Sequence, residues 1–272
     1  MMFIIMIDYK VFIILIYILI TVYFVYHFSN KNIYENFTDS ELQTYDIALS
    51  RYNEDIEWIN NYPFKHFNIK CYNKGPQEPN DKCRSDKCKI INVENVGRCD
   101  HTYLYHIINN YDNLAPITLF IPASCMKHQF KYNIVMKLLE LINETKTTVL
   151  LGTLMNDIRT DLYQFTLDEW SSSDNTNKTA NAESKLDPCS IRPFGAWYEA
   201  NFGDLYTQVI CHFGIFAVAK QHIIQHPKSY YENLISYLDH HSNPEAGHYF
   251  ERSWAAIFYP YPESCVHFFN HG

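Results

Sequence analysis

Two short polar segments carry residue types that bind nucleotides. In the segment RYNED, the guanidinium of Arg51 is suited to a phosphate, and the polar side chains of Asn53 and Asp55 are suited to a nucleoside. In the segment NKG, the ammonium of Lys74 is also suited to a phosphate. Simpler roles compete with these, because Asn or Asp before a helix can cap it, and a turn alone accounts for the composition of NKG.

A third segment, NVGRCDH, precedes apolar residues at helical spacing. Arg98 and His101 therefore fall in the first turn of a predicted helix, where unpaired backbone N–H groups and the helix dipole favour an anion. Arg98 is the best candidate for contacting a diphosphate in a site that lacks a metal. The alternative is a structural ion pair between Arg98 and Asp100 or Asp112.

A carboxylate and an imidazole follow each other near the end of the chain. His248 and Glu251 are three residues apart in a predicted helix and so share one of its faces. Glu251 is the candidate general base, with His248 beside it. The alternative is that Glu251 pairs with a nearby arginine and fixes the helix. The sequence has no Gly-x-Ser-x-Gly, Walker or HExxH motif, so hydrolases of that kind, NTPases and zinc proteases lose support.

The elements that must position these residues alternate along the chain. Apolar runs bounded by polar turns predict strands, and apolar residues at helical spacing predict helices between them. Strands are expected at 45–50, 67–72, 117–121, 147–154 and 214–219, helices between Ile56 and Pro63 and at 100–111, 130–143, 195–202, 220–239 and 245–258, and loops at 76–92 and 171–187. This order predicts an α/β fold, a three-layer sandwich with a mainly parallel central sheet, whose loops after the strands carry the site.

The composition of the chain sets its broad class. It has 272 residues, of which 47% are hydrophobic and 16% aromatic, which provides a packed core and excludes a wholly disordered chain. The formal net charge is −8 and no long basic run is present. Nucleic acid is therefore not an expected partner.

The N-terminal segment is predicted to anchor the chain in a membrane. From Val11 to Phe28 no side chain carries a fixed charge, and such a run at a rise of about 1.5 Å per residue nearly spans a hydrocarbon core of about 30 Å. We expect a transmembrane signal-anchor in contact with membrane lipid at 1–28, a stem at 29–44 and the α/β domain at 45–272. A cleaved signal peptide is the alternative, but its apolar run would be shorter and the sequence YHFS is a poor cleavage site.

The cysteines and sequons bear on which side of the membrane the domain lies. All eight cysteines follow the anchor segment, and their even number favours disulfides over a metal site, with buried free thiols as the alternative. Cys83 and Cys88 flank a short basic turn and are suited to closing a small loop. Asn36, Asn143 and Asn177 begin glycosylation sequons. We therefore expect a lumenal or extracellular glycoprotein domain.

Longer motifs resemble a known family. In order and spacing over about 45–262, the chain resembles the domain of unknown function 3431 family through RYNEDIEWI, NVGRCDHTYLYHIINNYDNL, GIFAVAKQHIIQHPKSYYENLISYL and GHYFERSWAAIF. The layout of that family is similar to GT-A glycosyltransferases. The resemblance implies a membrane-anchored glycosyltransferase-like protein that transfers a sugar from a nucleotide-sugar donor to a glycan or protein acceptor.

The resemblance also implies roles for individual residues. Glu251 would activate the acceptor, since GT-A enzymes often carry this carboxylate in a late segment. His128, which follows the central strand, would stand near the leaving phosphate. Trp197 is expected in the core, with stacking on a sugar as the alternative.

The sequence departs from the family pattern in two places. Cys99 stands where the family usually has an acidic residue. The central strand ends in IPAS, without the Asp-x-Asp that holds Mg²⁺ or Mn²⁺ in metal-dependent enzymes. No metal site is therefore expected, and either transfer is metal-free or the domain has lost it. A non-catalytic binding or viral envelope-type protein on the same scaffold is the alternative, and a hydrolase that uses Glu251 and His248 is a third.

Overall fold

The computed structural model of the chain consists of two compact units, Met1–Thr38 and Asp39–Gly272. The described residues are 14, 16–22, 44–76, 83–167 and 186–269. Within them, no helix is both long enough and apolar enough to cross a membrane. The predicted features that lie outside the described residues, wholly or for most of their length, are the anchor at 1–28, the stem at 29–44, the loop at 171–187 and the sequons at Asn36 and Asn177. The membrane anchor and the location of the domain stay predictions.

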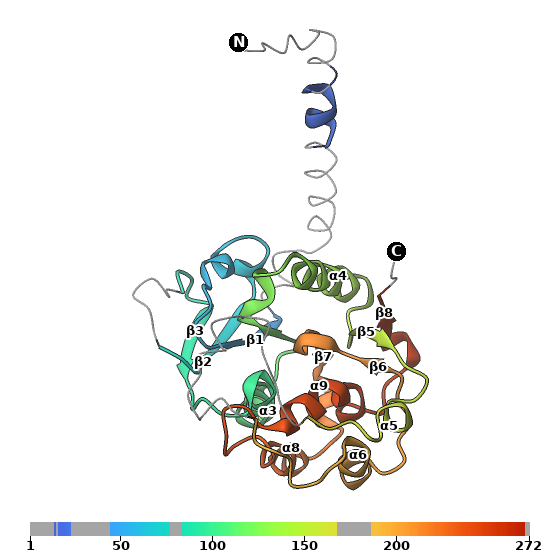
Figure 1. Cartoon of the computed structure of the whole chain (residues 1–272). Helices are drawn as coiled ribbons and strands as arrows, with labels where there is room; N and C mark the ends of the chain where they lie inside the picture. The colour runs from blue at the N-terminus through green and yellow to red at the C-terminus, as the bar shows by residue number, and fades with distance from the viewer. Residues whose placement is uncertain (1–13, 15, 23–43, 77–82, 168–185, 270–272) are drawn as a thin grey trace, which may run out of the picture. The chain divides into compact units, whose positions relative to one another are not determined.

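A five-stranded sheet forms the centre of the second unit (Figure 1). Its strands, in spatial order, are β3 (Cys88–Asn92), β2 (Asn68–Asn73), β1 (Asp46–Arg51), β4 (Ile117–Pro122) and β7 (Phe216–Ala219). Strands β1 to β4 are parallel, and only β7 runs antiparallel to its neighbour. The mainly parallel sheet is thus confirmed, and the loops after β1, β2, β3 and β4 leave it at one edge.

A smaller sheet continues the larger one. It has the order β6 (Val209–Ile210), β5 (Leu150–Leu154) and β8 (Val266–Phe268). A bridge between Val149 and Ala217 connects it to β7. Gly152 of β5 lies where a Cβ would be 1.9 Å from the carbonyl oxygen of Ile210, so only glycine allows β6 to come this close.

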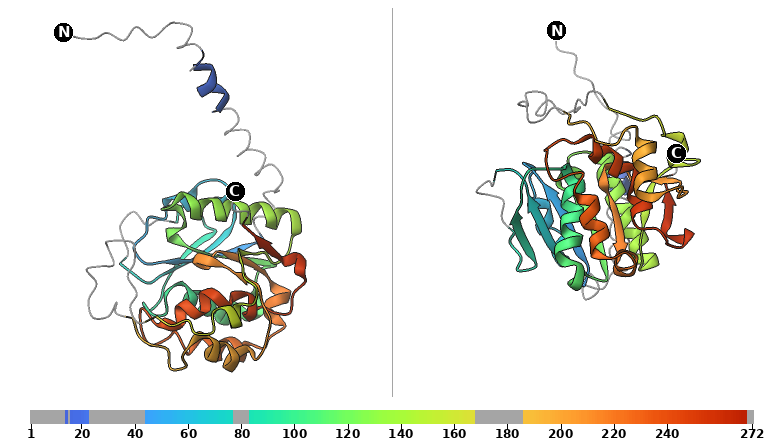
Figure 2. Two further views of the ribbon diagram at one scale, coloured as in Figure 1. Left: turned by 45° about the vertical axis from the view of Figure 1, so that its right-hand side comes forward. Right: turned by 90° about the horizontal axis from the view of Figure 1, so that it is seen from below.

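Helices cover both faces of the sheet (Figures 1 and 2). One face is covered by α4 (Gln129–Thr145), and the opposite layer contains α3 (Arg98–Asn110), α6 (Phe194–Phe202), α8 (Lys228–Ile235) and α9 (Glu245–Ile257). The shorter elements are α5 (Ile158–Asp161), α7 (Lys220–Ile224) and the 3-10 turns η1 (Glu57–Asn60), η2 (Phe64–His66), η3 (Tyr111–Asn113), η4 (Ala123–Met126), η7 (His212–Gly214) and η8 (Glu263–Cys265). The result is the three-layer α/β arrangement expected from the sequence.

Aromatic side chains join the sheet to the layer that holds α9. Phe120 of β4 and Phe216 of β7 lie with ring centroids 5.1 Å apart, and Trp254 of α9 lies 4.9 Å from Phe216. Tyr103 of α3 packs against Phe120 at 5.2 Å and donates its hydroxyl to the carbonyl oxygen of Gly214 at 2.8 Å. All four rings are fully buried. Because such burial is the main favourable term in folding, this cluster fixes α3 and α9 over the sheet.

The elements differ from the prediction in three places. The single helix expected at 220–239 is two helices, α7 and α8, because Pro227 lacks a backbone N–H and cannot continue the first of them. The segment 76–92, expected to be a loop, contains β3, an edge strand with half-exposed side chains. The short helix expected before Pro63 is the 3-10 turn η1.

One disulfide is present, between Cys83 and Cys88, as the spacing predicted. The expectation of further disulfides is wrong, because the remaining cysteines are free thiols: Cys71, Cys99, Cys125, Cys189, Cys211 and Cys265. Five of these six are buried, so they act as small apolar core residues. Asn143 lies in α4, where its side-chain oxygen accepts a hydrogen bond from Lys146 at 3.0 Å, and its glycosylation stays a prediction.

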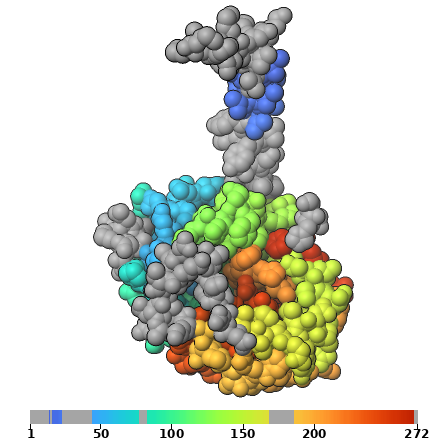
Figure 3. All heavy atoms as spheres, in the orientation of Figure 1, coloured from blue at the N-terminus to red at the C-terminus, as the bar shows by residue number. Residues whose placement is uncertain are grey.

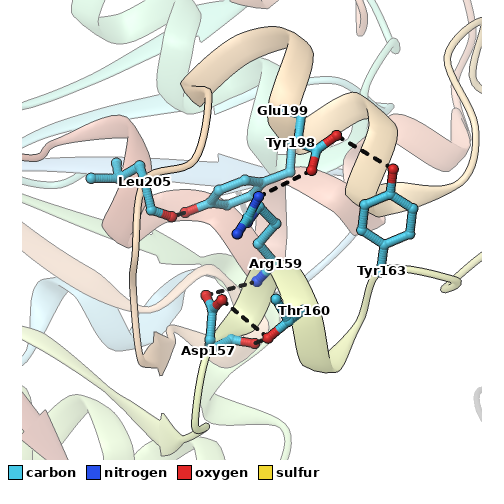
Figure 4. A network of polar contacts seen from close by, with 7 residues as sticks. All are labelled: Asp157, Arg159, Thr160, Tyr163, Tyr198, Glu199 and Leu205. Atoms are coloured by element: carbon cyan, nitrogen blue, oxygen red, sulfur yellow. Dashed lines mark hydrogen bonds and ion pairs between the residues drawn. The ribbon is translucent and has the colours of Figure 1, made fainter.

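A polar network fixes α5 against α6 (Figure 4). The carboxylate of Glu199 accepts hydrogen bonds from Arg159 at 3.1 Å and from the hydroxyl of Tyr163 at 3.3 Å. Asp157 caps α5 by accepting from the backbone N–H of Arg159, and the Tyr198 hydroxyl donates to the carbonyl oxygen of Leu205. The network is structural, since these bonds join side chains to the elements next to them.

Candidate active site

The loops after β1 and β2 are joined by Arg51. Its NH1 donates to the side-chain oxygen of Asn73 at 2.5 Å and to the carbonyl oxygen of Pro76 at 2.9 Å, and its Nε donates to the carbonyl oxygen of Glu54 at 2.9 Å. The side chain is 2% exposed. A phosphate could reach this guanidinium only by replacing such bonds, so Arg51 holds the shape of the two loops.

The predicted nucleoside-binding residues Asn53 and Asp55 are both exposed on the loop after β1. Asp55 accepts a hydrogen bond from the backbone N–H of Glu57 at 2.8 Å and so steadies the start of η1, although the N-cap position itself is Ile56. Glu54 turns the loop by accepting from the backbone N–H groups of Tyr52 and Asn53 at 2.7 and 3.1 Å. Within this segment the structure shows a capped turn, and its contact with a nucleoside stays a prediction.

Lys74 connects the loop after β2 to the start of α3. Its buried ammonium donates to the carbonyl oxygen of Val96 at 2.5 Å and to that of Arg98. Burial lowers the pKa of Lys74 to about 7. These carbonyls are presented by a left-handed turn, in which Gly97 has φ +59° and Arg98 has φ +54°. A Cβ at position 97 would lie 2.4 Å from the carbonyl oxygen of Leu238, which explains the glycine of the NVGR motif.

Arg98 and His248 meet although 150 residues separate them. NH1 of Arg98 lies 3.1 Å from Nε2 of His248 and donates to the side-chain oxygen of Asn243 at 3.2 Å. Burial, reinforced by the charges of Arg98 and Arg252, lowers the pKa of His248 to about 3. The imidazole is therefore neutral at physiological pH and accepts from Arg98. The close approach of α9 depends on Gly247, where a Cβ would lie 3.3 Å from Cδ of Arg98.

A pair of carboxyl groups completes the cluster. Asp100 of α3 is 2% exposed and accepts a hydrogen bond from the indole N–H of Trp254 at 3.0 Å. Glu251 of α9 accepts from the backbone N–H of Phe213 at 2.7 Å, and its other oxygen lies 3.7 Å from NH1 of Arg252. Burial, and then the charge of Glu251, raise the pKa of Asp100 to about 7, while Arg98 acts in the opposite direction.

The structure therefore places Arg98 in contact with His248, and both Arg98 and Glu251 within electrostatic range of Asp100, while the predicted roles of these residues stay predictions. The alternative role of Glu251 was an ion pair with a nearby arginine. Such a pair is present with Arg252, at the long distance of 3.7 Å. Asp100 was not predicted as a site residue, although it is the next residue after Cys99, where the family pattern expects an acid. Asp100 belongs to the cluster because its carboxyl group is buried beneath α9, which raises its pKa.

The predicted histidines differ in their surroundings. His101 is 7% exposed, stacks on Tyr105 at 6.0 Å, and its Nδ1 has no hydrogen-bond partner among the described residues. Burial and the charge of Lys74 lower the pKa of His101 to about 3. His128 precedes α4, is exposed, and stacks on Phe130 at 5.5 Å. Trp197 is a core residue, as expected, and its fully buried ring rules out the alternative of stacking on a sugar.

No three His, Cys, Asp or Glu side chains in the described part of the chain gather into a group able to hold a metal ion. The strand end at Pro122 passes directly into the 3-10 turn η4, whose side chains are Ala123, Ser124, Cys125 and Met126. This segment offers no carboxylate to a cation.

The raised pKa of Asp100 predicts how the stability of the domain changes with pH. Its folded-state pKa of about 7 exceeds the ordinary value of 3.8, so the folded state binds the proton more tightly and stability falls as pH rises from about 4 to about 7. Asp100→Asn removes this loss and keeps an oxygen for Trp254. Urea unfolding should show the variant gaining about 3 to 4 kcal/mol on the wild type over that interval, at about 1.4 kcal/mol per pH unit.

The buried histidines do not obscure this difference. His101, His106 and His248 have lowered pKa values, so they destabilise both proteins equally as the pH falls. A difference between wild type and Asp100→Asn that stays constant from pH 4 to pH 8 would contradict the buried, proton-binding state of Asp100.

Comparison with known families gives one match. The family model described as "Protein of unknown function (DUF3431)" matches residues 47–270. No protein among those with curated descriptions matches the chain. The match runs from the second residue of β1 to beyond the end of β8 and includes every residue of the cluster described above.

Proposed function

The chain belongs to the DUF3431 family, whose description leaves its function open, and we propose that it is a glycosyltransferase-like enzyme of GT-A layout. It transfers a sugar from a nucleotide-sugar donor to a glycan or protein acceptor. The observation that carries the proposal is the convergence of Arg98, His248 and Glu251 at the start of α3. Lys74, in the loop after β2, donates to the carbonyl oxygen of Arg98 and so holds that loop against the start of α3. This is the edge of the sheet at which parallel sheets bind ligands.

The strand order supports the same proposal. The feature that favours a GT-A layout is the run of four parallel strands in the order β3-β2-β1-β4, followed by an antiparallel strand. In that layout the donor lies against the loops after the first, second and central strands. Here those loops start at Arg51, Asn73 and Pro122 and leave the sheet at one edge.

Glu251 has the geometry for a base. One carboxylate oxygen is fixed by the N–H of Phe213, and the other has only Arg252 beside it at 3.7 Å among its described ion-pair contacts. That second oxygen is the one to accept the proton of an acceptor hydroxyl. His248 is neutral and holds Arg98, so it acts as a positioning residue.

A non-catalytic binding protein is the second candidate. The observation that favours it is the use of the cations Arg51 and Lys74 within the protein itself, where they bind carbonyl oxygens and Asn73. Such a protein would bind a sugar or nucleotide without turnover, so an assay of donor cleavage separates the two functions.

Calorimetry with the full chain tests donor binding. We expect at least one of a panel of UDP-, GDP- and CDP-sugars to bind without a divalent cation, because the central strand lacks the carboxylates that would hold one. Addition of Mn²⁺ should change the affinity of that donor by less than about threefold. Absence of binding across the whole panel, with and without Mn²⁺, would refute the proposed function.

A further inference from the structure

Lys131 is a cation outside the motifs that resemble the family. It lies in the first turn of α4, is half-buried, and its ammonium is 5.0 Å from the centroid of the Phe213 ring. Among the described residues it forms no ion pair and no hydrogen bond. A half-buried ammonium loses part of its hydration, and a cation–π contact returns only about 1–2 kcal/mol. Lys131 is therefore poorly compensated in the free protein.

The other cations of the site are already hydrogen-bonded to the protein. Arg51, Lys74 and Arg98 donate to carbonyl oxygens, an amide oxygen or a ring nitrogen of the protein. They use their hydrogen-bonding capacity to hold the loops at the edge of the sheet. Lys131 retains all three ammonium donors for a ligand.

Lys131 stands between the elements that form the site. The carboxylates that act electrostatically on it are those of Glu251 on α9 and Glu54 after β1, while the nearby thiols of Cys99 and Cys125 stay neutral because burial raises their pKa. Burial lowers the pKa of Lys131, and the two carboxylates oppose that shift. The ammonium thus lies within electrostatic range of the loop after β1 and of α9.

The wall beside Lys131 is aromatic and partly open. Phe130 is 51% exposed and packs edge-on against Phe213, with centroids 5.2 Å apart. Phe213 is held with φ +64°, a conformation that bulky residues rarely adopt, and its N–H is fixed by Glu251. Figure 3 shows atoms of the α4 region (green) meeting those of the segment that contains η7 (orange) at the surface. Phe213 therefore links Lys131 to the carboxylate of Glu251.

We propose that Lys131 binds the diphosphate of the nucleotide-sugar donor and neutralises the charge of the leaving group, so that transfer proceeds without a metal bound by an Asp-x-Asp motif. The inference rests on the proposed function. The acceptor oxygen forms a bond to the anomeric carbon while the bond from that carbon to the diphosphate oxygen breaks. The acceptor proton goes to Glu251, and the electron pair of the broken bond stays on the diphosphate, next to the ammonium of Lys131.

Calorimetry on the full chain with three probes tests this assignment: inorganic pyrophosphate, the tightest binder among UDP, GDP and CDP, and the matching nucleoside. Lys131→Met should weaken the first two by about tenfold or more, because a charge-assisted contact is lost, and leave the nucleoside unchanged. Lys131→Arg should recover part of the affinity. The control is Lys137→Met on the same helix, where the lysine pairs with Glu140 at 3.0 Å; it should leave all three affinities unchanged.

The outcomes separate this inference from the proposed function. If the wild type binds nucleotide sugars and Lys131→Met binds pyrophosphate and the diphosphate as tightly, the role of Lys131 is refuted and the function stands. If pyrophosphate binding depends on Lys131 while no nucleotide sugar binds, the anion site stands and the function is refuted. If the wild type binds none of these probes, both are refuted.

Discussion

Replacing Glu245 with alanine is expected to destabilise the folded domain by about 3 to 5 kcal/mol, which is typical of removing one partner of a buried ion pair. The side chain of Glu245 is fully buried at the start of α9, and one oxygen pairs with Nε of Arg192 at 2.9 Å. The carboxylate also accepts from the backbone N–H groups of Leu167 and Cys189 and from the hydroxyl of Tyr249, each within 2.9 Å. Alanine would leave all four donors without this acceptor.

Urea unfolding followed by tryptophan fluorescence measures the effect. Two milder variants serve as controls. Tyr249→Phe removes a single neutral donor and should cost about 1 kcal/mol of stability. Glu245→Gln keeps an acceptor oxygen but loses the charge opposite Arg192, so its loss of stability should lie between those of the other two variants. A loss below about 1 kcal/mol for Glu245→Ala would show that the donors find other partners and that the carboxylate does not hold the 187–192 segment against α9.

Much of the fold was predictable because its strands are simple apolar runs. β1, β4 and β7 each bury nearly all of their residues, which produces runs such as IALS and ITLFI. β3 was missed because it is an edge strand with half-exposed side chains, so the polarity of Lys89 and Asn92 gave it the composition of a loop. The two-residue strand β6 is fixed by pairing with β5 and carries no local pattern of its own.

The break between α7 and α8 shows a different limit. The apolar spacing continues from 220 to 239, and this periodicity predicted one helix. Pro227 was in the sequence and marked the break, because the residue before a proline disfavours the helical conformation. In this case the proline sets where the helix ends, although the apolar periodicity continues past it.

The site was predictable in position and much less so in role. Parallel strands bring their loops to one edge, which places Arg98 there, and its contact with His248 depends on the packing of α9 against α3. Whether a cation binds a ligand or the protein depends on its neighbours, which come from distant segments. Lys74 is satisfied by carbonyl oxygens of the NVGR turn, whereas Lys131 has no such partner. Sequence spacing alone does not separate these two lysines.

Glu251→Gln is expected to slow cleavage of the bound nucleotide sugar by about a hundredfold or more, the range found when a general base is removed. Glutamine has nearly the same shape and keeps an oxygen for the N–H of Phe213, so the conformation of that residue should persist. It lacks the negative charge that accepts a proton. Release of nucleoside diphosphate, with water and a panel of glycans as acceptors, measures the rate, and calorimetry should show donor affinity within about threefold of wild type.

The control is Glu232→Gln, which removes an exposed carboxylate from α8 and should leave the rate unchanged. A Glu251→Gln protein that is folded, binds the donor and cleaves it at the wild-type rate would remove Glu251 from the chemistry. If Asp100→Asn then lost the activity, the buried carboxyl beside Arg98 would be the base, because its pKa of about 7 suits proton transfer at neutral pH. If wild-type protein binds a donor and never cleaves it, the non-catalytic candidate is favoured, since Arg51 and Lys74 then serve only to shape a binding surface.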